Sequence, residues 1–275
     1  MSIDQNTPKM SCKEALTLLD QVSESLTYPV WIPSLKGDVL FKEINTKQQK
    51  EILQAIVDSP FYKTKFITTF YKIIKDNFMG EEDPDNFTIL DKQLILLKTR
   101  SVCFSPEYTI TTDENVNPKV DLNSLYEKSS QSIFDNEIHV LDCGQDIVIS
   151  VQLPTIKLEF KLEDELHKDL EIMSVNDTNS LRQTLGELFM GEIAKYIISI
   201  QIKDSVIDFA SFKSFKEKIS ILEKLPAKAI QSVIEYIDQQ KEIIDEIVTV
   251  NLKDRVTNKE VKVKIDIDST FFNTR

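Results

Sequence analysis

The sequence is poor in glycine, cysteine and histidine. It has five glycines, three cysteines and two histidines in 275 residues. The cysteines (Cys12, Cys103 and Cys143) are odd in number and widely spaced, so we expect no disulfide framework and a reducing compartment. Zinc would need distant carboxylates to join His139 or His167. We therefore expect neither a metal nor another cofactor.

Long apolar runs are also missing. No run approaches the roughly 18 residues that a membrane-spanning helix requires. The first residues, MSIDQNTPKMSCKEAL, lack the basic and apolar segments of a signal peptide. We therefore expect a soluble intracellular protein that contacts no membrane.

The charge balance is acidic, with 45 Asp and Glu against 33 Lys and Arg, a formal net charge of -12. Proteins that bind nucleic acid usually gather basic residues on one face to neutralise phosphates. Here the lysines are scattered among acidic residues, as in Lys157, Glu159 and Lys161. We expect no direct nucleic-acid binding.

Apolar residues recur at helical spacing in the first 102 residues and again after residue 180. We predict helices over residues 12–26, from a capping box at Thr46 and Gln49, after Pro60, and from Thr88 to about 102. Later helices are predicted after Ser180, across the stripe of Phe212, Phe215, Ile219 and Leu222, and after Pro226.

Alternating patterns predict strands at residues 39–41, 108–112 and 156–162, and hairpins at 138–151, 197–209 and 248–267. Residues 113–131 are read mostly as a connection. The predicted class is α+β, with amphipathic helices, short antiparallel strands and a C-terminal β-hairpin. We divide the chain into a helical N-terminal region with short strands (1–112), a polar connection with a hairpin and strand (113–175) and a helical C-terminal region ending in a hairpin (176–275).

The patterns that could carry chemistry are weak. Gly186 and Gly191 have phosphate-loop spacing, but Glu192 and Ile193 follow where Lys and Ser or Thr are required, and the segment has a helical pattern. His139 and Cys143 flank a predicted turn without further ligands nearby, and Cys103 follows an apolar helix. We interpret Glu81–Asp83 as a solvated loop and His167 as a solvated helix residue. No catalytic residue is predicted.

Four blocks resemble, in order and spacing, the baseplate hub assembly proteins of T-even-type contractile-tailed bacteriophages. They are YPVWIPSLKGDVLFKEINTKQQKEILQAI (28–56), FTILDKQLILLKTRSVC (87–103), IAKYIISIQIKDSVIDFASFKSFKEKISILEKLPAKAIQSVIEYID (193–238) and IVTVNLKDRVTNKEVKVKIDIDSTFF (247–272). Family members often carry a cysteine pair in the last hairpin loop, which resembles half of a zinc ribbon. The loop here, 253–260, has no cysteine, so this metal feature does not carry over. Residues 113–173 have no assigned counterpart.

The resemblance implies a late phage protein, made in the host cytoplasm, that helps the tail baseplate hub to assemble by binding other hub proteins. It leaves open whether the protein stays in the virion or acts transiently as a chaperone. Two alternatives are a hydrolase or nuclease that uses magnesium held by Asp and Glu, and a structural virion protein outside the hub.

Two adjacent aromatic residues, Phe271 and Phe272, lie near the C-terminus. Neighbouring residues of a strand point to opposite sides, so one face of a fold does not easily bury both rings. The candidate partner-binding residues are therefore Phe271 and Phe272, with one ring left exposed for another protein. The alternative is that the tail turns back and both rings dock on the core.

Overall fold

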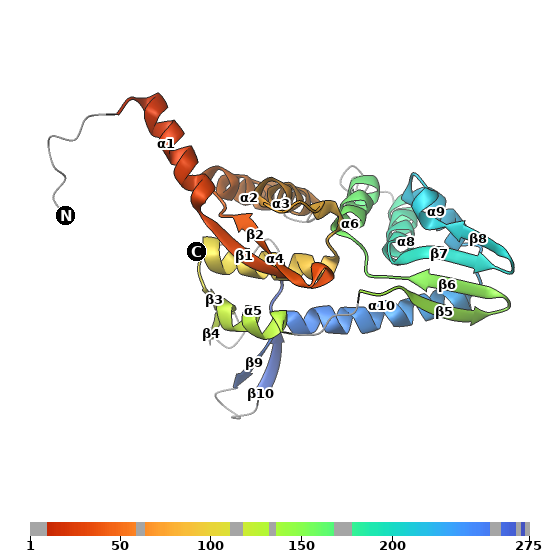
Figure 1. The fold of residues 1–275 in the computed structure, drawn as a ribbon. Coiled ribbons are helices and arrows are strands. Elements are labelled where there is room, and N and C mark those ends of the chain that lie inside the picture. The colour runs from red at the N-terminus through yellow and green to blue at the C-terminus, as the bar shows by residue number, and fades with distance from the viewer. Residues whose placement is uncertain are drawn as a thin grey trace.

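The computed structural model describes residues 10–58, 64–110, 118–131, 136–167, 178–253, 260–267 and 271–272. They form a mixed α+β structure with small antiparallel sheets, which confirms the predicted class (Figure 1). The helices are α1 (Cys12–Ser25), α2 (Thr46–Asp58), α3 (Thr64–Asn77), α4 (Ile89–Cys103), α5 (Leu122–Ser130), α6 (Ile156–Leu162), α8 (Thr178–Ala194), α9 (Phe215–Leu222) and α10 (Ala227–Ile247). The strands are β1 (Thr27–Ile32), β2 (Gly37–Lys42), β3 (Glu107–Thr109), β4 (Lys119–Asp121), β5 (His139–Gly144), β6 (Ile147–Val151), β7 (Ile197–Ile202), β8 (Ser205–Asp208), β9 (Thr249–Lys253) and β10 (Glu260–Lys264).

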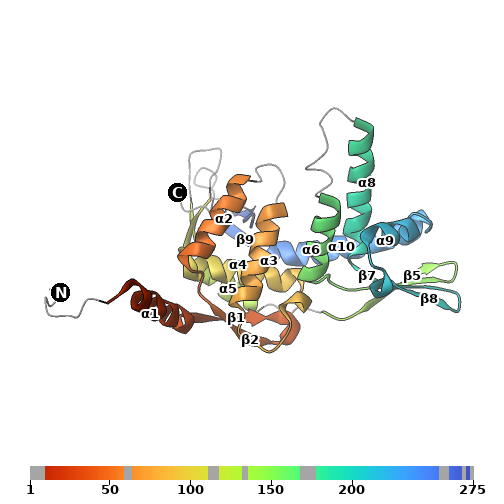
Figure 2. The same ribbon diagram turned by 90° about the horizontal axis from the view of Figure 1, so that it is seen from above.

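Helix α4 forms the centre of the N-terminal part. The β1–β2 hairpin, α5, α6 and α10 all contact it, so it is buried on several sides. Its start is fixed by a capping box in which Thr88 and Asp91 exchange hydrogen bonds. Helices α2 and α3 pack against each other (Figure 2).

The larger sheet has the order β5-β6-β7-β8, and every neighbouring pair is antiparallel. Gln145 and Asp146 both have positive φ between β5 and β6, which is the geometry of a two-residue hairpin turn. Because β6 pairs with β7, the predicted regions 113–175 and 176–275 both contribute strands to this sheet.

Helix α10 connects the two ends of the molecule. It contacts α4 and α5 at one end and β5, β6 and α8 at the other (Figure 1). The chain then forms the β9–β10 hairpin, which confirms the predicted C-terminal hairpin. The predicted stripe is confirmed at Phe215, Ile219 and Leu222, which are buried on α9, whereas Phe212 precedes the helix and is half-buried.

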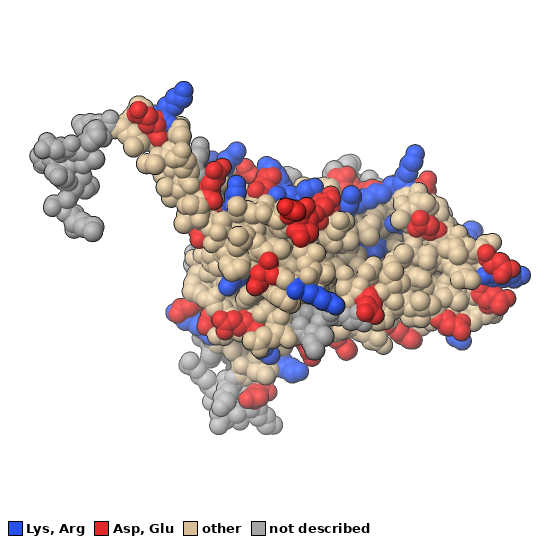
Figure 3. Space-filling view, in the orientation of Figure 1, with Lys and Arg blue, Asp and Glu red and all other residues tan. Residues whose placement is uncertain are grey.

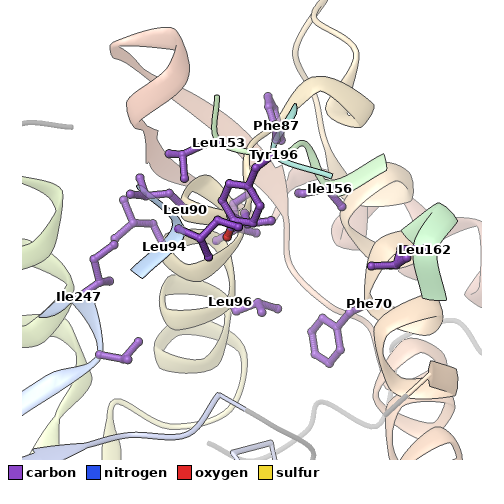
Figure 4. Close-up of a cluster of buried hydrophobic side chains, with 14 of the residues drawn as sticks. Phe70, Phe87, Leu90, Leu94, Leu96, Leu153, Ile156, Leu162, Tyr196 and Ile247 are labelled. Atoms are coloured by element: carbon purple, nitrogen blue, oxygen red, sulfur yellow. The ribbon is translucent and has the colours of Figure 1, made fainter. Parts of the chain in front are cut away.

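The core is continuous across both ends. Its central part brings together side chains that are far apart in the sequence (Figure 4). The labelled residues come from α3, α4, the segment just before α4, α6, the segments beside β6 and β7, and the end of α10: Phe70, Phe87, Leu90, Leu94, Leu96, Leu153, Ile156, Leu162, Tyr196 and Ile247. Within the described ranges, no helix combines the length and the apolar character that crossing a bilayer requires.

The strand predicted over residues 156–162 is wrong, because this segment is helix α6. Pro154 and Thr155 precede it, and the Thr155 hydroxyl accepts a hydrogen bond from the Leu158 N–H. Apolar residues at every second position lie around several sides of a helix. They are tolerated here because α3, α4 and η2 (Pro84–Asn86) all contact α6.

The connection predicted over residues 113–131 is also wrong for its described part, which contains β4 and α5. Asp121 accepts from the Asn123 N–H at the start of α5. The buried residues of α5 are spaced as on one helix face: Leu122, Leu125, Tyr126 and Ser129. This spacing is visible in the sequence, although polar neighbours obscure it.

Two predicted helix starts are displaced. The capping pair of α2 is one residue earlier than predicted, because Asn45 accepts from the Gln48 N–H and Gln48 accepts from the Asn45 N–H. Ser180 lies inside α8, which begins at Thr178.

Candidate protein-binding surface on helix α1

Helix α1 is strongly two-sided. A capping box starts it: Ser11 Oγ accepts from the Glu14 N–H at 3.3 Å, and Glu14 Oε2 accepts from the Ser11 N–H at 2.8 Å. The Ser11 hydroxyl also donates to Glu14 Oε2 at 2.7 Å, and this bond, together with the one from the Ser11 N–H, lowers the pKa of the exposed Glu14 carboxyl. At 100° per residue, one side of the helix carries apolar residues and the other carries polar ones. The apolar side comprises Ala15, Leu16, Leu18, Leu19 and Val22, and the polar side Lys13, Glu14, Thr17, Gln21 and Glu24.

The apolar side of α1 faces solvent. Leu16 and Leu19 expose 57% and 63% of their surface, and Leu18 and Val22 expose about half. Figures 1 and 2 both show α1 extending away from the rest of the fold. Scattered exposed leucines are ordinary, whereas a contiguous apolar side of this kind marks an interaction surface.

The polar side of α1 contributes to its contact with the body. Glu24 lines a hollow of about 320 Å³ together with Lys42, Glu43, Asp76 and a group of amide side chains, Asn45, Gln48 and Asn77. Glu24 is on the side of α1 opposite Val22, so this contact leaves the apolar side uncovered.

The amides of the hollow are themselves paired. Gln48 Nε2 donates to Asn77 Oδ1 at 2.8 Å, and Asn77 Nδ2 donates back to Gln48 Oε1 at 3.3 Å. Among the residues that the structure describes, no three His, Cys, Asp or Glu side chains are placed to hold a metal ion, and this includes the acidic groups of the hollow.

The structure places the predicted partner-binding residues, Phe271 and Phe272, in the core. Both rings are fully buried. The Phe272 ring centroid lies 4.4 Å from that of Phe70, and the Phe271 ring centroid lies 5.1 Å from that of Tyr108. The two residues form a turn instead of a strand, so neighbouring rings are not forced to opposite faces. The docking alternative holds, and neither ring is exposed for a partner.

Arg100 fixes this turn. Its Nε donates to the Phe271 carbonyl at 2.8 Å, and its Nη1 donates to the Ser105 carbonyl at 2.7 Å. The guanidinium lies over the rings of Phe104 and Phe271. Burial lowers the pKa of Arg100, but stacking and hydrogen bonds are the interactions a guanidinium uses well when partly desolvated. No local pattern in the sequence predicts this link.

The weaker sequence candidates are separated. Gly186 and Gly191 both lie within α8, so they form no phosphate-binding loop. A Cβ on Gly191 would lie 2.5 Å from Leu162 Cδ1, whereas a Cβ on Gly186 would point into open space. Only Gly191 is therefore needed for close helix packing. The His139 ring packs on Tyr236, and Cys143 is buried against α10.

The remaining candidates are no closer to forming a site. Cys103 Sγ accepts from the Ile44 N–H at 3.4 Å, and burial raises its pKa, which keeps the thiol protonated. Glu81 and Glu82 are exposed, and Asp83 caps η2. The His167 side chain lies outside the described residues.

Two carboxylates that sequence reasoning did not single out are held by partly buried contacts. Glu159 on α6 accepts from Lys92 Nζ on α4 at 2.6 Å. Burial alone would raise the pKa of Glu159, but the ammonium groups of Lys92 and Lys195 outweigh it and lower the pKa. Asp85 is held similarly by Lys75 at 2.7 Å and by the Tyr71 hydroxyl. Such contacts join helices and require no substrate.

Comparison with known proteins gives no match: no family model, no curated protein and no solved structure is significantly similar to this chain.

Proposed function

We propose that this protein assists the assembly of a phage tail baseplate hub, and that it acts by binding other hub proteins through the apolar side of α1. The exposed apolar side is the observation that carries this proposal. Covering Leu16, Leu19 and Val22 is worth roughly 1.5–3 kcal/mol for each side chain that becomes fully buried. A protein that binds a partner recovers this free energy when the apolar side of α1 is covered, whereas a protein that binds nothing leaves that side exposed to water.

The sequence resemblance supports the hub as the setting. Its four blocks fall on β1–β2–α2, on α4, on β7–β8–α9–α10 and on the β9–β10 segment through Phe272. We therefore propose synthesis late in infection in the host cytoplasm, followed either by release, as for a chaperone, or by retention in the virion.

The two alternative functions require different features of the structure. A hydrolase or nuclease using magnesium requires carboxylates that converge, and the described residues contain no group of three or more placed to do so. A structural virion protein outside the hub would also use α1, but its partners would be tail-tube or wedge proteins.

The test is co-purification of the tagged protein from infected cells, followed by mass spectrometry. We expect hub proteins with the wild type and at least a tenfold smaller yield of them with Leu16→Glu/Leu19→Glu. The matched control is Thr17→Glu/Gln21→Glu, which adds the same charge to the polar side of the same helix. Recovery of tube or wedge proteins, or equal loss with both variants, would contradict the proposal.

A further inference from the structure

The larger sheet has an open edge at β5. This strand pairs with β6 on one side, and in the described part of the chain no strand pairs with its other side. Edge strands present unpaired N–H and C=O groups to which another strand can bond. The sequence of β5, HVLDCG, contains neither proline nor lysine, two residues that commonly block such an addition. A β-bulge between Asp142 and Gly144 limits the regular part of the edge to residues 139–142.

Hydrogen bonds at the two ends of β6 show which of its residues face β7. The Gln152 N–H donates to the Tyr196 carbonyl, and the Asp146 carbonyl accepts from the Lys203 N–H. Both bonds are on the β7 side. Because both backbone groups of a residue in an antiparallel strand point the same way, and neighbours point oppositely, the even-numbered residues of β6 bond to β7 and the odd-numbered ones bond to β5.

The free backbone groups of β5 follow from this alternation. The odd-numbered residues of β6 lie opposite His139 and Leu141, which therefore take part in the β5–β6 hydrogen bonds. Val140 lies between these two residues and Asp142 follows them. Both therefore direct their N–H and C=O groups away from β6. The Val140 side chain is 66% exposed. The open edge therefore offers two residues in the conformation that an added strand requires.

A groove accompanies this edge. Between β5 and α10 lies a hollow of about 390 Å³, with Leu141 and Tyr236 as apolar wall and Ser232 and Gln239 as polar groups on α10. A strand beside a helix is the arrangement in which added peptides gain main-chain hydrogen bonds from the strand and side-chain pockets from the groove.

The groove is acidic. The residues that line it include the acidic Asp142 and Glu235, together with His139, and they include no Lys or Arg. Acidic side chains are also seen along the margin of the molecule over β5 and α10 (Figure 3). A second copy of this chain would bring the same carboxylates and a net charge of -12, so charge complementarity favours a basic partner.

We propose that the open edge of β5 and the groove beside α10 bind an extended basic segment of a partner protein, which adds to the sheet as a fifth strand. Its backbone bonds to Val140 and Asp142. Apolar side chains on one of its faces pack on Leu141 and Tyr236 in the groove, and Lys or Arg side chains on its other face lie beside Asp142, which alternation places on the opposite face of β5 from Leu141. This inference rests on the proposed protein-binding function and adds a second surface, at the other end of the molecule from α1.

The probe is a fluorescein-labelled peptide of alternating valine and lysine, seven residues long, with an analogue in which glutamate replaces lysine. Fluorescence anisotropy measures the dissociation constants. We expect saturable binding of the lysine peptide to the full chain and at least tenfold weaker binding of the glutamate analogue. Val140→Pro removes an outward N–H without touching the β5–β6 ladder, so it weakens binding at least tenfold.

The matched control is Val206→Pro at the opposite edge. Ile149 of β6 bonds to β5, so Ile200 opposite it bonds to β8, and Val206 again points its N–H outward. Val206 is 64% exposed, nearly as much as Val140. We expect its substitution to change the dissociation constant less than twofold.

A measurement on the wild type covers the case in which Val140→Pro fails to fold. Hydrogen exchange should show that the peptide protects the amides of Val140 and Asp142 and leaves that of Val206 unchanged. Equal effects of the two prolines, equal binding of the glutamate analogue, or absent protection at Val140 would overturn the proposal. So would a dimer in analytical ultracentrifugation that Val140→Pro dissociates, since a second copy would then occupy the edge. The peptide assay contains no hub protein, so it can fail while the α1 test succeeds, and the reverse.

Discussion

Arg100 and Phe271 are 171 positions apart in the chain and are joined by a hydrogen bond of 2.8 Å from the guanidinium Nε to the backbone carbonyl. The bond holds the C-terminal turn against α3 and α4, where the Phe272 ring contacts Phe66 and Phe70. The last described residues of the chain therefore complete the core that the first hundred residues begin.

The first prediction concerns this turn. Phe272→Ala removes a fully buried ring and should lower the free energy of unfolding by about 3–5 kcal/mol. Urea denaturation followed by circular dichroism measures this. Phe189→Ala, at an exposed position of α8, is the control and should cost less than about 1 kcal/mol. Similar midpoints for the two variants would show that the turn is not part of the folded core in solution.

The second prediction uses the two glycines of α8. Gly186→Ala adds a methyl group in open space and should stabilise the protein by about 0.5–1 kcal/mol, because alanine favours helix more than glycine does. Gly191→Ala gains the same preference but places its Cβ against Leu162 and Leu166, at 2.5 and 2.9 Å from their Cδ1 atoms. Overpacking of this kind costs about 1–3 kcal/mol, partly relieved by movement of the leucine ends.

The order of the two glycine variants is therefore the measured quantity. Thermal unfolding should give Gly186→Ala a higher midpoint than the wild type and Gly191→Ala a lower one than Gly186→Ala. If Gly191→Ala were the more stable variant, α8 would not approach α6 as closely as the structure shows.

The third prediction is a pH dependence. The folded state lowers the pKa of Glu159 below its ordinary value of 4.5. A lowered carboxyl pKa contributes stability that is present above the unfolded value and is lost as the pH falls through the folded value. The contribution should therefore be complete at pH 6–7 and should decline below about pH 4.5.

Glu159→Gln isolates this contribution. At neutral pH it should cost about 2 kcal/mol, less than the 3–5 kcal/mol of a fully buried pair because the side chains of Glu159 and Lys92 are each 17% exposed. Unfolding free energies at pH 7 and pH 3.5 give the difference between variant and wild type, which should shrink at the lower pH. Glu107→Gln, in an exposed ion pair with Lys119, is the control. A constant difference across this range would contradict the assignment.

Patterns among neighbouring residues were enough to predict several of the helices and hairpins. These include the cap at Thr88, the alternating hairpins at residues 138–151 and 248–267, and the apolar stripe of α9. Each of these signals comes from residues that are close together in the sequence. The spacing of apolar and capping residues is enough to predict these elements. The same reasoning failed at α6, because alternating apolar residues also fit a helix that is contacted by several neighbouring elements.

Which apolar faces are covered depends on the packing of the whole fold and could not be predicted from local patterns. Leu16 and Leu19 on α1 have the same helical spacing as Ile219 and Leu222 on α9, yet the first pair faces solvent and the second is buried. The C-terminal tail shows the opposite case, because Phe271 and Phe272 were predicted to leave one ring exposed and are both buried. The physical reason is common to both cases: periodicity states that a face is apolar, whereas its cover comes from segments distant in the chain, such as Arg100 for Phe271. The same holds for the open edge of β5, because whether a strand has one neighbour or two depends on which strands the whole fold brings beside it.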